Sequence, residues 1–409
     1  MFVGIYLTLQ SKFLQFKVLW NFKAQLRDLN ICVKNKKIGV HPLKLYFASI
    51  GGMIGLGNIA SISTTLTIGG PGALIWLWIS SLLGMLVKYS EVYLAVKYRV
   101  KNNQGSYDGG PMFYLRNAFN NKYIPIVVCV MLCFYSIEVY QFLIMTDSVV
   151  RTFQINKIIA VILILLLVLL SSIRGIKGLA DVCSFLMPPF IIIYICIGFW
   201  IAFLHHQLFL SLLREIFSSF FTLKSQIVGI IGGGVLISAH YGLSNAVYSG
   251  DIGIGYDSVV QSETTFIYPE KQAKIAIYSL FADTIICTIT VFILLVSGIW
   301  KVKNLSESDY IFSALRDSIP YAEYFITSLF FVTGFTTVVG YLVIGRKCAK
   351  FISKEYGSKI YMCCSMFSFL FFSFFEQFYV KGIMFLIAGI LMTINIIGII
   401  QLRKEIIFF

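Results

Sequence analysis

Long apolar stretches follow one another along nearly the whole chain, and short polar loops separate them. A helix that crosses a bilayer needs about 20 mostly apolar residues, and these stretches have about that length. The pattern therefore predicts an all-α, polytopic membrane protein. The expected full spans, numbered two to eleven, lie near residues 46–67, 73–96, 123–146, 156–173, 183–204, 226–248, 273–298, 322–345, 360–377 and 382–402.

Three segments do not fit the pattern of full spans. Residues 1–20 are apolar in part but too short to cross a bilayer, so we expect a truncated first helix there. Segments 108–120 and 207–222 mix polar and apolar residues, which is typical of helices that lie in the membrane interface. No soluble domain fits between the spans, so residues 1–409 are expected to form a single membrane domain.

Lysine and arginine residues gather in alternate loops. If the loop before span two is cytoplasmic, the cytoplasmic segments carry 24 of these residues and the opposite side carries 8. Cytoplasmic loops of membrane proteins are enriched in Lys and Arg. The bias predicts that the N-terminus is outside and the C-terminus is cytoplasmic. It also supports the span count, because one missed span would disturb the alternation.

Composition agrees with a membrane protein and excludes other classes. The chain is 58% hydrophobic and 13% charged, which leaves too little polar surface for a soluble domain. The net charge of +14 suggests nucleic acid as a partner, but the basic residues lie in short loops between spans, so we expect none. The nine cysteines have no spacing typical of zinc or redox sites.

Span two contains four glycines within seven residues: Gly51, Gly52, Gly55 and Gly57. Each glycine in a helix interior costs about 1 kcal/mol relative to alanine, so we expect the helix to break here. Backbone groups released at membrane depth are tolerated where they line a cavity or bind a ligand. Released carbonyls can ligate a small cation, and released N–H groups at a helix start can hold a carboxylate. The alternative is that the glycines only allow close helix packing.

Span seven carries a second cluster, Gly232, Gly233 and Gly234, followed by a segment that contains Ser238. Glycine interruptions at corresponding positions of two halves point to the central site of a transporter. Spans two and seven run in opposite directions, and each is followed by four more spans. The topology therefore allows an inverted repeat, with the first repeat and the start of the second in 46–248 and the second repeat in 226–402.

The run GDIGIG at 250–255 imitates a phosphate-binding loop. It has neither the Lys-Ser/Thr of a Walker loop nor a preceding strand, so we expect no nucleotide site.

Polar residues inside the spans are candidates for ion binding. Thr333, Thr336 and Thr337 share one helix face and can give oxygen ligands to a hard cation. Lys88 and Glu91 lie three residues apart and are expected to pair, because unpaired charge in a membrane is costly.

Three further titratable residues lie in spans. Asp283, His240, and Glu138 with Gln141 three residues later can relay protons. The alternative is that they are structural, with the acids paired and the histidine satisfied in the interior.

At these residues the chain resembles the alanine or glycine:cation symporter family, that is the sodium:alanine symporters, as a divergent member. GGPGALIWLWISSLLGMLVKYSEVYLAVKYR (69–99) and GGPMFYL (109–115) are similar to the family's GGPGA-aliphatic-FWMW run, KxxE pair and GGPM segment. The resemblance covers nearly the whole chain. Three features depart from it. Leu56 replaces the Thr of a Gly-Thr-Gly-Asn run, 249–255 replaces Ser-Asn-Glu-Ala-Gly-Leu-Gly, and the first helix is nearly absent.

The resemblance implies a five-plus-five inverted-repeat, leucine-transporter-like fold with discontinuous spans two and seven. It implies a Na⁺ site between spans two and nine, at the carbonyls or hydroxyls of Gly51, Ile54, Thr333, Thr336 and Thr337. The implied substrate site lies at the two breaks, with candidate residues Gly55, Leu56, Gly57, Asn58, Gln141, Gly233, Gly234 and Ser238.

The expected function is secondary symport, in which Na⁺ drives import of a small neutral amino acid such as alanine or glycine, across a bacterial cell membrane and by a monomer. No cofactor is expected. One alternative is coupling to H⁺ through Asp251, Asp283 or His240. Another is a membrane protein that binds amino acids without transporting them. A membrane enzyme is not expected, because the sequence shows no HExxH, GxSxG or paired-carboxylate arrangement.

Overall fold

A computed structural model describes residues 1–23, 25, 27, 38–102, 105–221, 233–316, 318–373 and 377–408. In these ranges, six helices are long and apolar enough to cross a membrane, and a seventh span is formed if one bent helix pair is counted. Two shorter apolar helices, α10 (Lys157–Ser172) and α18 (Gly357–Phe372), add to this set.

The described helices form two series of five membrane elements. The five membrane elements of the first series are, in order, α4 (Pro42–Met53) with η1 (Gly57–Ser61) and α5 (Ile62–Gly69), then α6 (Ala73–Lys97), then α8 (Tyr123–Tyr135) with α9 (Val139–Phe153), then α10, and then α11 (Gly175–Leu204). The five elements of the second series are, in order, α13 (Gly233–Ser249) with α14 (Tyr256–Gln261), then α15 (Pro269–Ser297), α17 (Ala322–Ile352), α18 and α19 (Gln377–Gln401). Each series begins with an interrupted helix, as the inverted repeat requires.

Shorter elements lie at the periphery. The expected stub at the N-terminus is two short helices, α1 (Phe2–Gln10) and α2 (Leu14–Trp20), which pack against α6. The two segments expected as interfacial helices are α7 (Pro111–Phe119) and α12 (His206–Phe221). The remaining elements are strands β1 (Val100–Lys101) and β2 (Tyr107–Asp108), helix α16 (Glu307–Arg316), and the 3-10 turns η2 (Ile299–Lys301) and η3 (Arg403–Glu405).

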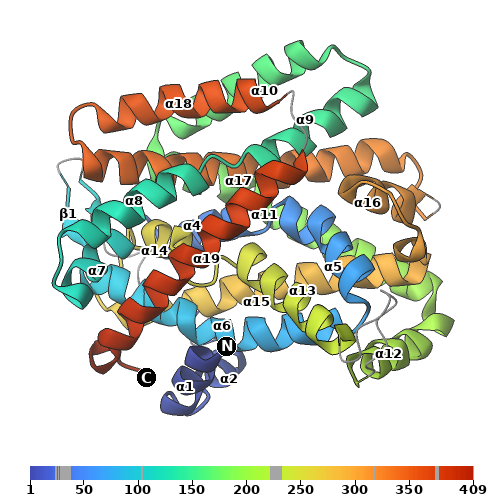
Figure 1. The fold of residues 1–409 in the computed structure, drawn as a ribbon, viewed down its shortest axis with the longest axis horizontal. Coiled ribbons are helices and arrows are strands. Elements are labelled where there is room, and N and C mark those ends of the chain that lie inside the picture. Colours follow the sequence, from blue (N-terminus) through green and yellow to red (C-terminus); the bar gives the residue numbers. More distant parts are fainter. Residues whose placement is uncertain are drawn as a thin grey trace.

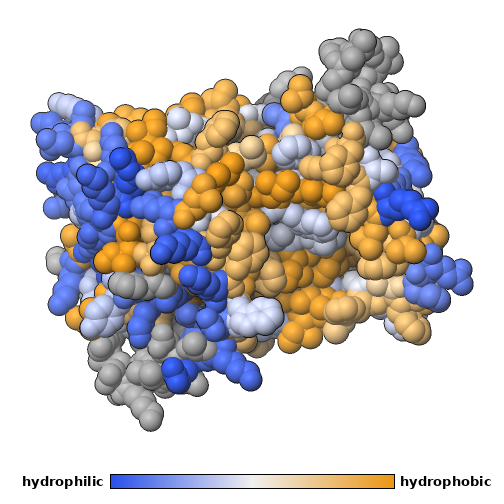
Figure 2. Space-filling view, turned by 90° about the horizontal axis from the view of Figure 1, so that it is seen from below, coloured by the Kyte–Doolittle hydropathy of each residue, from blue (hydrophilic) through white to orange (hydrophobic). Residues whose placement is uncertain are grey.

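The long helices run along the longest axis of the molecule (Figure 1). One end carries β1, α7 and the C-terminus, and the other end carries α12 and α16. Hydrophilic residues gather at the two ends, and a broad hydrophobic zone lies between them (Figure 2). On α10, Ile162 and Leu166 are each more than half exposed, which is expected of side chains that face lipid. The two polar ends and the apolar zone are those of a multi-pass membrane protein.

The second interruption is not where the glycine cluster predicted it. Gly233 and Gly234 form the first turn of the continuous helix α13, and Gly232 lies outside the described residues. The chain leaves helical geometry at 250–255, where Asp251, Gly253 and Gly255 all have positive φ. Span seven therefore continues beyond the predicted limit of 248, as α13, this break and α14.

Candidate functional site

The first interruption is the one predicted. Helix α4 ends at Met53, the chain turns through Ile54 and Gly55, and η1 and α5 continue at an angle of 51°. Two side-chain oxygens accept hydrogen bonds from backbone N–H groups at the break. Leu56 N donates to Gln141 Oε1 at 2.7 Å, and Gly55 N donates to Asn58 Oδ1 at 3.2 Å. The break is thus stabilised by polar side chains from α9 and from its own far side.

The predicted cation residues come together where α17 crosses this break. Thr337 Oγ1 donates to the carbonyl of Gly51 at 3.2 Å, and Thr336 Oγ1 lies 3.2 Å from the carbonyl of Thr333. A Cβ on Gly55, the residue after Ile54, would lie only 2.8 Å from Thr337 Oγ1. Gly51, Ile54, Thr333, Thr336 and Thr337 are all buried, and Gly51 and Thr337 bond directly across this contact between α4 and α17.

The chemistry of this contact suits a hard monovalent cation. Its polar atoms are carbonyl and hydroxyl oxygens, which are the ligands that hard cations prefer. In the described part of the chain, no group of three or more His, Cys, Asp or Glu side chains is arranged to hold a metal ion. A transition-metal site is therefore not indicated there.

A small cavity lies between the two interruptions. Its volume is about 10 Å³, roughly the space of one water molecule. It is lined by Gly52, Met53, Gly57, Tyr135, Glu138, Gln141, Tyr248, Ser249, Thr337 and Tyr341. Of the predicted substrate residues, Gly57 and Gln141 line it directly, and Gly55, Leu56 and Asn58 adjoin them in the break. Alanine does not fit this volume, so admission of an amino acid requires the lining side chains to move.

Asp283 connects the two interruptions. Its carboxylate accepts a hydrogen bond from Asn58 Nδ2 at 2.5 Å and another from Ser249 Oγ at 3.2 Å. Cys287, one helical turn later on α15, lies 3.3 Å from the same Asn58 nitrogen. Because Asn58 follows the first break and Ser249 precedes the second, one carboxylate on α15 links the two discontinuous helices.

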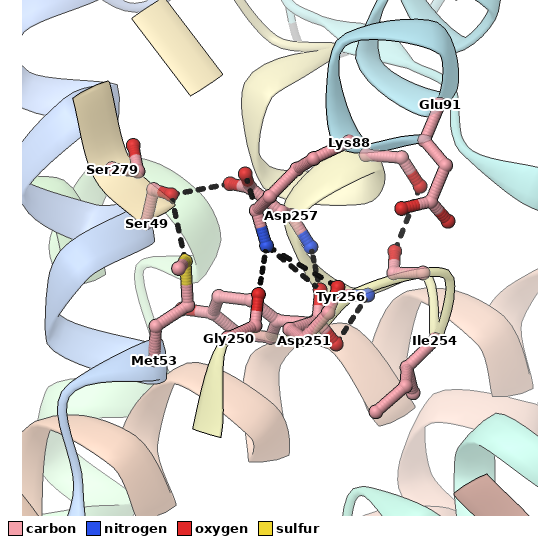
Figure 3. Close-up of polar contacts among 12 residues, drawn as sticks. Ser49, Met53, Lys88, Glu91, Gly250, Asp251, Ile254, Tyr256, Asp257 and Ser279 are labelled. Carbon is pink, nitrogen blue, oxygen red and sulfur yellow. Dashed lines mark hydrogen bonds and ion pairs between the residues drawn. The ribbon is translucent and has the colours of Figure 1, made fainter. Parts of the chain in front are cut away.

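The second interruption is built around a buried ammonium group (Figure 3). Lys88 Nζ donates to the carbonyls of Gly250 at 2.5 Å and Asp251 at 3.2 Å, where α13 ends. It also lies 3.7 Å from the carboxylate of Asp251 and 3.5 Å from that of Asp257. The Asp251 carboxylate accepts the N–H of Asp257 at 2.9 Å and so caps the start of α14. Lys88 thus satisfies the carbonyls at the end of α13 and compensates the charge of the acid that caps the start of α14.

The predicted pair of Lys88 and Glu91 is wrong. Lys88 reaches the acids of the second break, and Glu91 Oε2 instead accepts the backbone N–H of Gly253 at 3.1 Å (Figure 3). Positions three residues apart on α6 point at the same partner segment, so both side chains bond to it. The three-residue spacing correctly predicted that Lys88 and Glu91 share a helix face, but it did not predict that both bond to the segment after α13 rather than to each other.

Gly233, Gly234 and Ser238 are not brought to the breaks. Gly250 lies 16 and 12 residues after Gly234 and Ser238, which corresponds to roughly 24 and 18 Å along a helix. Ser238 packs near Gly69, at the far end of α5. His240, also on α13, is exposed. The structure therefore places the second break, at 250–255, away from these three predicted residues, and Ser249 is the residue of α13 that lies beside the first break.

Seven lining residues were predicted for neither the substrate nor the cation. They are Gly52, Met53, Tyr135, Glu138, Tyr248, Ser249 and Tyr341. Glu138 shares a helix face with Gln141, and this spacing was the available signal. The tyrosines come from three helices, α8, α13 and α17, and nothing in their local sequence marks them.

Comparison with known proteins identifies the family. A model of the sodium:alanine symporter family matches residues 1–408. An uncharacterized transporter of Haemophilus influenzae is 30% identical over 416 residues, covering 99% of this chain and 90% of that protein. The chain belongs to the sodium:alanine symporter family.

Other members of this family have more specific names. The sodium/alanine symporter AgcS of Methanococcus maripaludis is 24% identical, with 88% of this chain and 80% of that protein covered. The amino-acid carrier protein AlsT of Bacillus subtilis is 26% identical, with 86% and 74% covered. The protein is therefore a multi-pass transporter of a symporter family rather than an enzyme.

Solved structures confirm the fold that the family resemblance implied. A Na⁺-coupled sialic acid symporter superposes with a TM-score of 0.61 at 13% identity, covering 95% of this chain and 86% of that one. MHP1, a nucleobase-cation-symport-1 family transporter, gives a TM-score of 0.55 at 12% identity, covering 88% and 80%. The chain has the five-plus-five, leucine-transporter-like fold.

Proposed function

We propose that this protein imports a small neutral amino acid, alanine or glycine, together with Na⁺. The main observation in support is that one cavity is lined by residues of both discontinuous helices and by Thr337. Thr337 also bonds to the carbonyl of Gly51, a candidate cation ligand. Backbone groups at helix breaks provide partners for a zwitterion, and the adjoining oxygen atoms provide ligands for the ion. The names of relatives such as AgcS support the choice of alanine and Na⁺.

The energy for uptake comes from the ion gradient, and no cofactor is required. One charge moving through 100 mV supplies about 2.3 kcal/mol, which is enough for roughly fifty-fold accumulation. We place the end that carries β1, α7 and the C-terminus in the cytoplasm of a bacterial cell, in agreement with the distribution of basic residues, and we expect a monomer.

Uptake into proteoliposomes tests this proposal. Purified protein is reconstituted, and labelled alanine, glycine and leucine are added with an inward Na⁺ gradient, an inward proton gradient or neither. We expect alanine and glycine to accumulate only with Na⁺. Accumulation driven by the proton gradient alone would favour coupling through buried acids such as Asp283. Saturable alanine binding without uptake under any gradient would instead indicate a binding protein.

A further inference from the structure

Glu138 is a buried acid at a distortion between two helices. Helix α8 ends at Tyr135 and α9 begins at Val139, and Glu138 adopts non-helical angles of φ −73° and ψ 61° at the N-cap of α9. Its side chain makes no capping hydrogen bond. The side chain lines the cavity between the two interrupted helices.

Nothing among the described residues compensates this carboxyl group. Glu138 is 1% exposed, and its Oε2 has no hydrogen-bond partner. None of the ion pairs in the described part of the chain includes it, and the buried ammonium of Lys88 pairs with Asp251 and Asp257 instead. A buried, unpaired carboxylate is costly, and a cationic partner in the cavity would remove that cost.

We propose that Glu138 binds the α-ammonium group of the transported amino acid. This inference rests on the proposed function and adds the partner of one substrate group. An ammonium group has three donors and no acceptor, so it needs acceptors such as the two carboxylate oxygens of Glu138. Gly57, at the start of η1, and Thr337, at the candidate cation ligands, line the same cavity. The substrate carboxylate is therefore directed to the first break and the Na⁺, and the ammonium to Glu138.

This arrangement selects for amino acids over other small carboxylates. Lactate and propionate carry the carboxylate but no ammonium group. Either would place a negative charge near Glu138 and leave that acid without its cation. Specificity of this kind comes from repulsion of the wrong ligand as well as attraction of the right one. The glycine-lined and tyrosine-lined walls restrict the size of the ligand.

Equilibrium binding to purified Glu138→Gln protein tests the role. Glutamine keeps the shape and removes the charge. With saturating Na⁺, we expect wild-type protein to bind alanine and not lactate, and Glu138→Gln to bind alanine at least about tenfold more weakly, as for loss of a hydrogen bond to a charged group. Asp147→Asn is the matched control, because Asp147 lies on the same helix but does not line the cavity. Its side chain is 42% exposed and pairs with Lys157. Its alanine affinity should be unchanged.

The outcomes separate the inference from the proposed function. Normal alanine affinity in Glu138→Gln overturns the role of Glu138 and leaves the proposed function standing. A variant with normal alanine affinity at saturating Na⁺ but a raised Na⁺ requirement makes Glu138 a cation ligand and also overturns the inference. Failure of wild-type protein to bind any amino acid overturns both proposals.

A second measurement uses wild-type protein and serves if Glu138→Gln is not monodisperse. A hydrophobic carbodiimide modifies buried carboxyl groups, and mass spectrometry of the peptide that contains Glu138 reports the extent of modification. We expect saturating alanine with Na⁺ to lower modification at Glu138 severalfold and lactate to leave it unchanged. Equal modification with and without alanine overturns the inference.

Discussion

The hydroxyl of Thr337 and the carbonyl of Gly51 lie 3.2 Å apart across α17 and α4. In Thr337→Val the shape is kept but this oxygen is lost from the candidate cation site. We expect the Na⁺ concentration for half-maximal alanine uptake to rise about tenfold or more, because loss of one polar ligand of an ion costs about 1.5–3 kcal/mol. Uptake rates measured over a range of Na⁺ concentrations check this.

Thr333→Val is the matched control. The Thr333 hydroxyl bonds to the carbonyl of Leu329 in its own helix at 2.9 Å, and the predicted cation ligand is its backbone carbonyl, which the substitution keeps. The control should retain the wild-type Na⁺ requirement. If Thr337→Val does so too, the hydroxyl is not a ligand.

Substitution by alanine is expected to have different effects at Gly57 and at Gly52, because an added Cβ meets different neighbours at the two positions. A Cβ on Gly57 would meet the Tyr248 ring at 3.1 Å and reach into the cavity, and a ring can shift by a few tenths of an ångström. A Cβ on Gly52 would lie 2.1 Å from the Tyr256 ring, which is itself fixed by a hydrogen bond to Ala48. Gly57→Ala should therefore fold and bind alanine about tenfold more weakly, whereas Gly52→Ala should lose folded protein.

Binding measurements and melting temperatures on monodisperse protein distinguish these effects. Wild-type affinity in Gly57→Ala would move the substrate away from the first break. A lowered yield in Gly57→Ala equal to that of Gly52→Ala would mean that both glycines serve packing alone.

At the scale of helices and their breaks, the sequence predicted more of the fold than of the site. Apolar length predicted the spans, because the bilayer allows only helices of about that length. The glycine cluster of span two marked a real break, whereas the described part of the cluster of span seven lies within a helix. Glycine lowers helix stability without saying how neighbouring helices respond, and Gly233 and Gly234 remain helical.

The true second break had a signal of another kind. Gly253 and Gly255 adopt φ of +78° and +117°, which glycine tolerates, and Asp251 adopts +49°. The partner of Lys88 lies 163 and 169 positions away along the chain, at Asp251 and Asp257. No local pattern specifies such a contact, so the buried charge cluster had to come from the structure.

The ammonium of Lys88 is expected to hold the second break together. Lys88→Met leaves Asp251 and Asp257 buried without their cation and the carbonyl of Gly250 without its donor. Breaking a buried ion pair on one side costs about 3–5 kcal/mol. We expect a clear drop in melting temperature and in folded yield, measured by thermal unfolding followed with size-exclusion chromatography.

Lys97→Met is the control on the same helix. Lys97 pairs with Glu405 while both side chains are more than a third exposed, and such pairs contribute about 0–1 kcal/mol. Partial recovery in a variant that also carries Asp251→Asn and Asp257→Asn would assign the loss to uncompensated charge. A melting temperature for Lys88→Met equal to that of wild-type protein would show that the cluster does not stabilise the break.

Across the whole molecule, polar contacts join the half-helices beyond the two breaks to neighbouring helices toward opposite ends of the molecule. At one end, the hydroxyls of Thr64 on α5 and Tyr140 on α9 both bond to Glu307 of α16. At the other end, Lys347 of α17 lies 2.5 Å from Glu263, just after α14. The half-helices α5 and α14 are thus each tied to a neighbour, and the cavity between them is small. A carrier must release one of these ends at a time.

Weakening the contacts of Glu307, or the ion pair of Glu263 with Lys347, should therefore open the cavity toward one side of the membrane. Glu307→Gln removes the charge from the α16 contacts, and Glu263→Gln removes it from the Lys347 pair. A charged, membrane-impermeant thiol reagent reports access to Cys287, which is buried beside Asn58, when mass spectrometry follows that peptide. We expect Glu307→Gln to raise labelling about fivefold or more from outside right-side-out vesicles, and Glu263→Gln to do so in inside-out vesicles, because each loses about 1–2 kcal/mol of a charged hydrogen bond. Asp147→Asn removes one partner of a surface ion pair elsewhere on the molecule and should change neither labelling rate.

The sides of the two effects also report orientation, since the end with α16 is proposed to face outward. Labelling raised from the same side by both variants would contradict alternating access through these two ties, and reversed sides would invert the proposed topology.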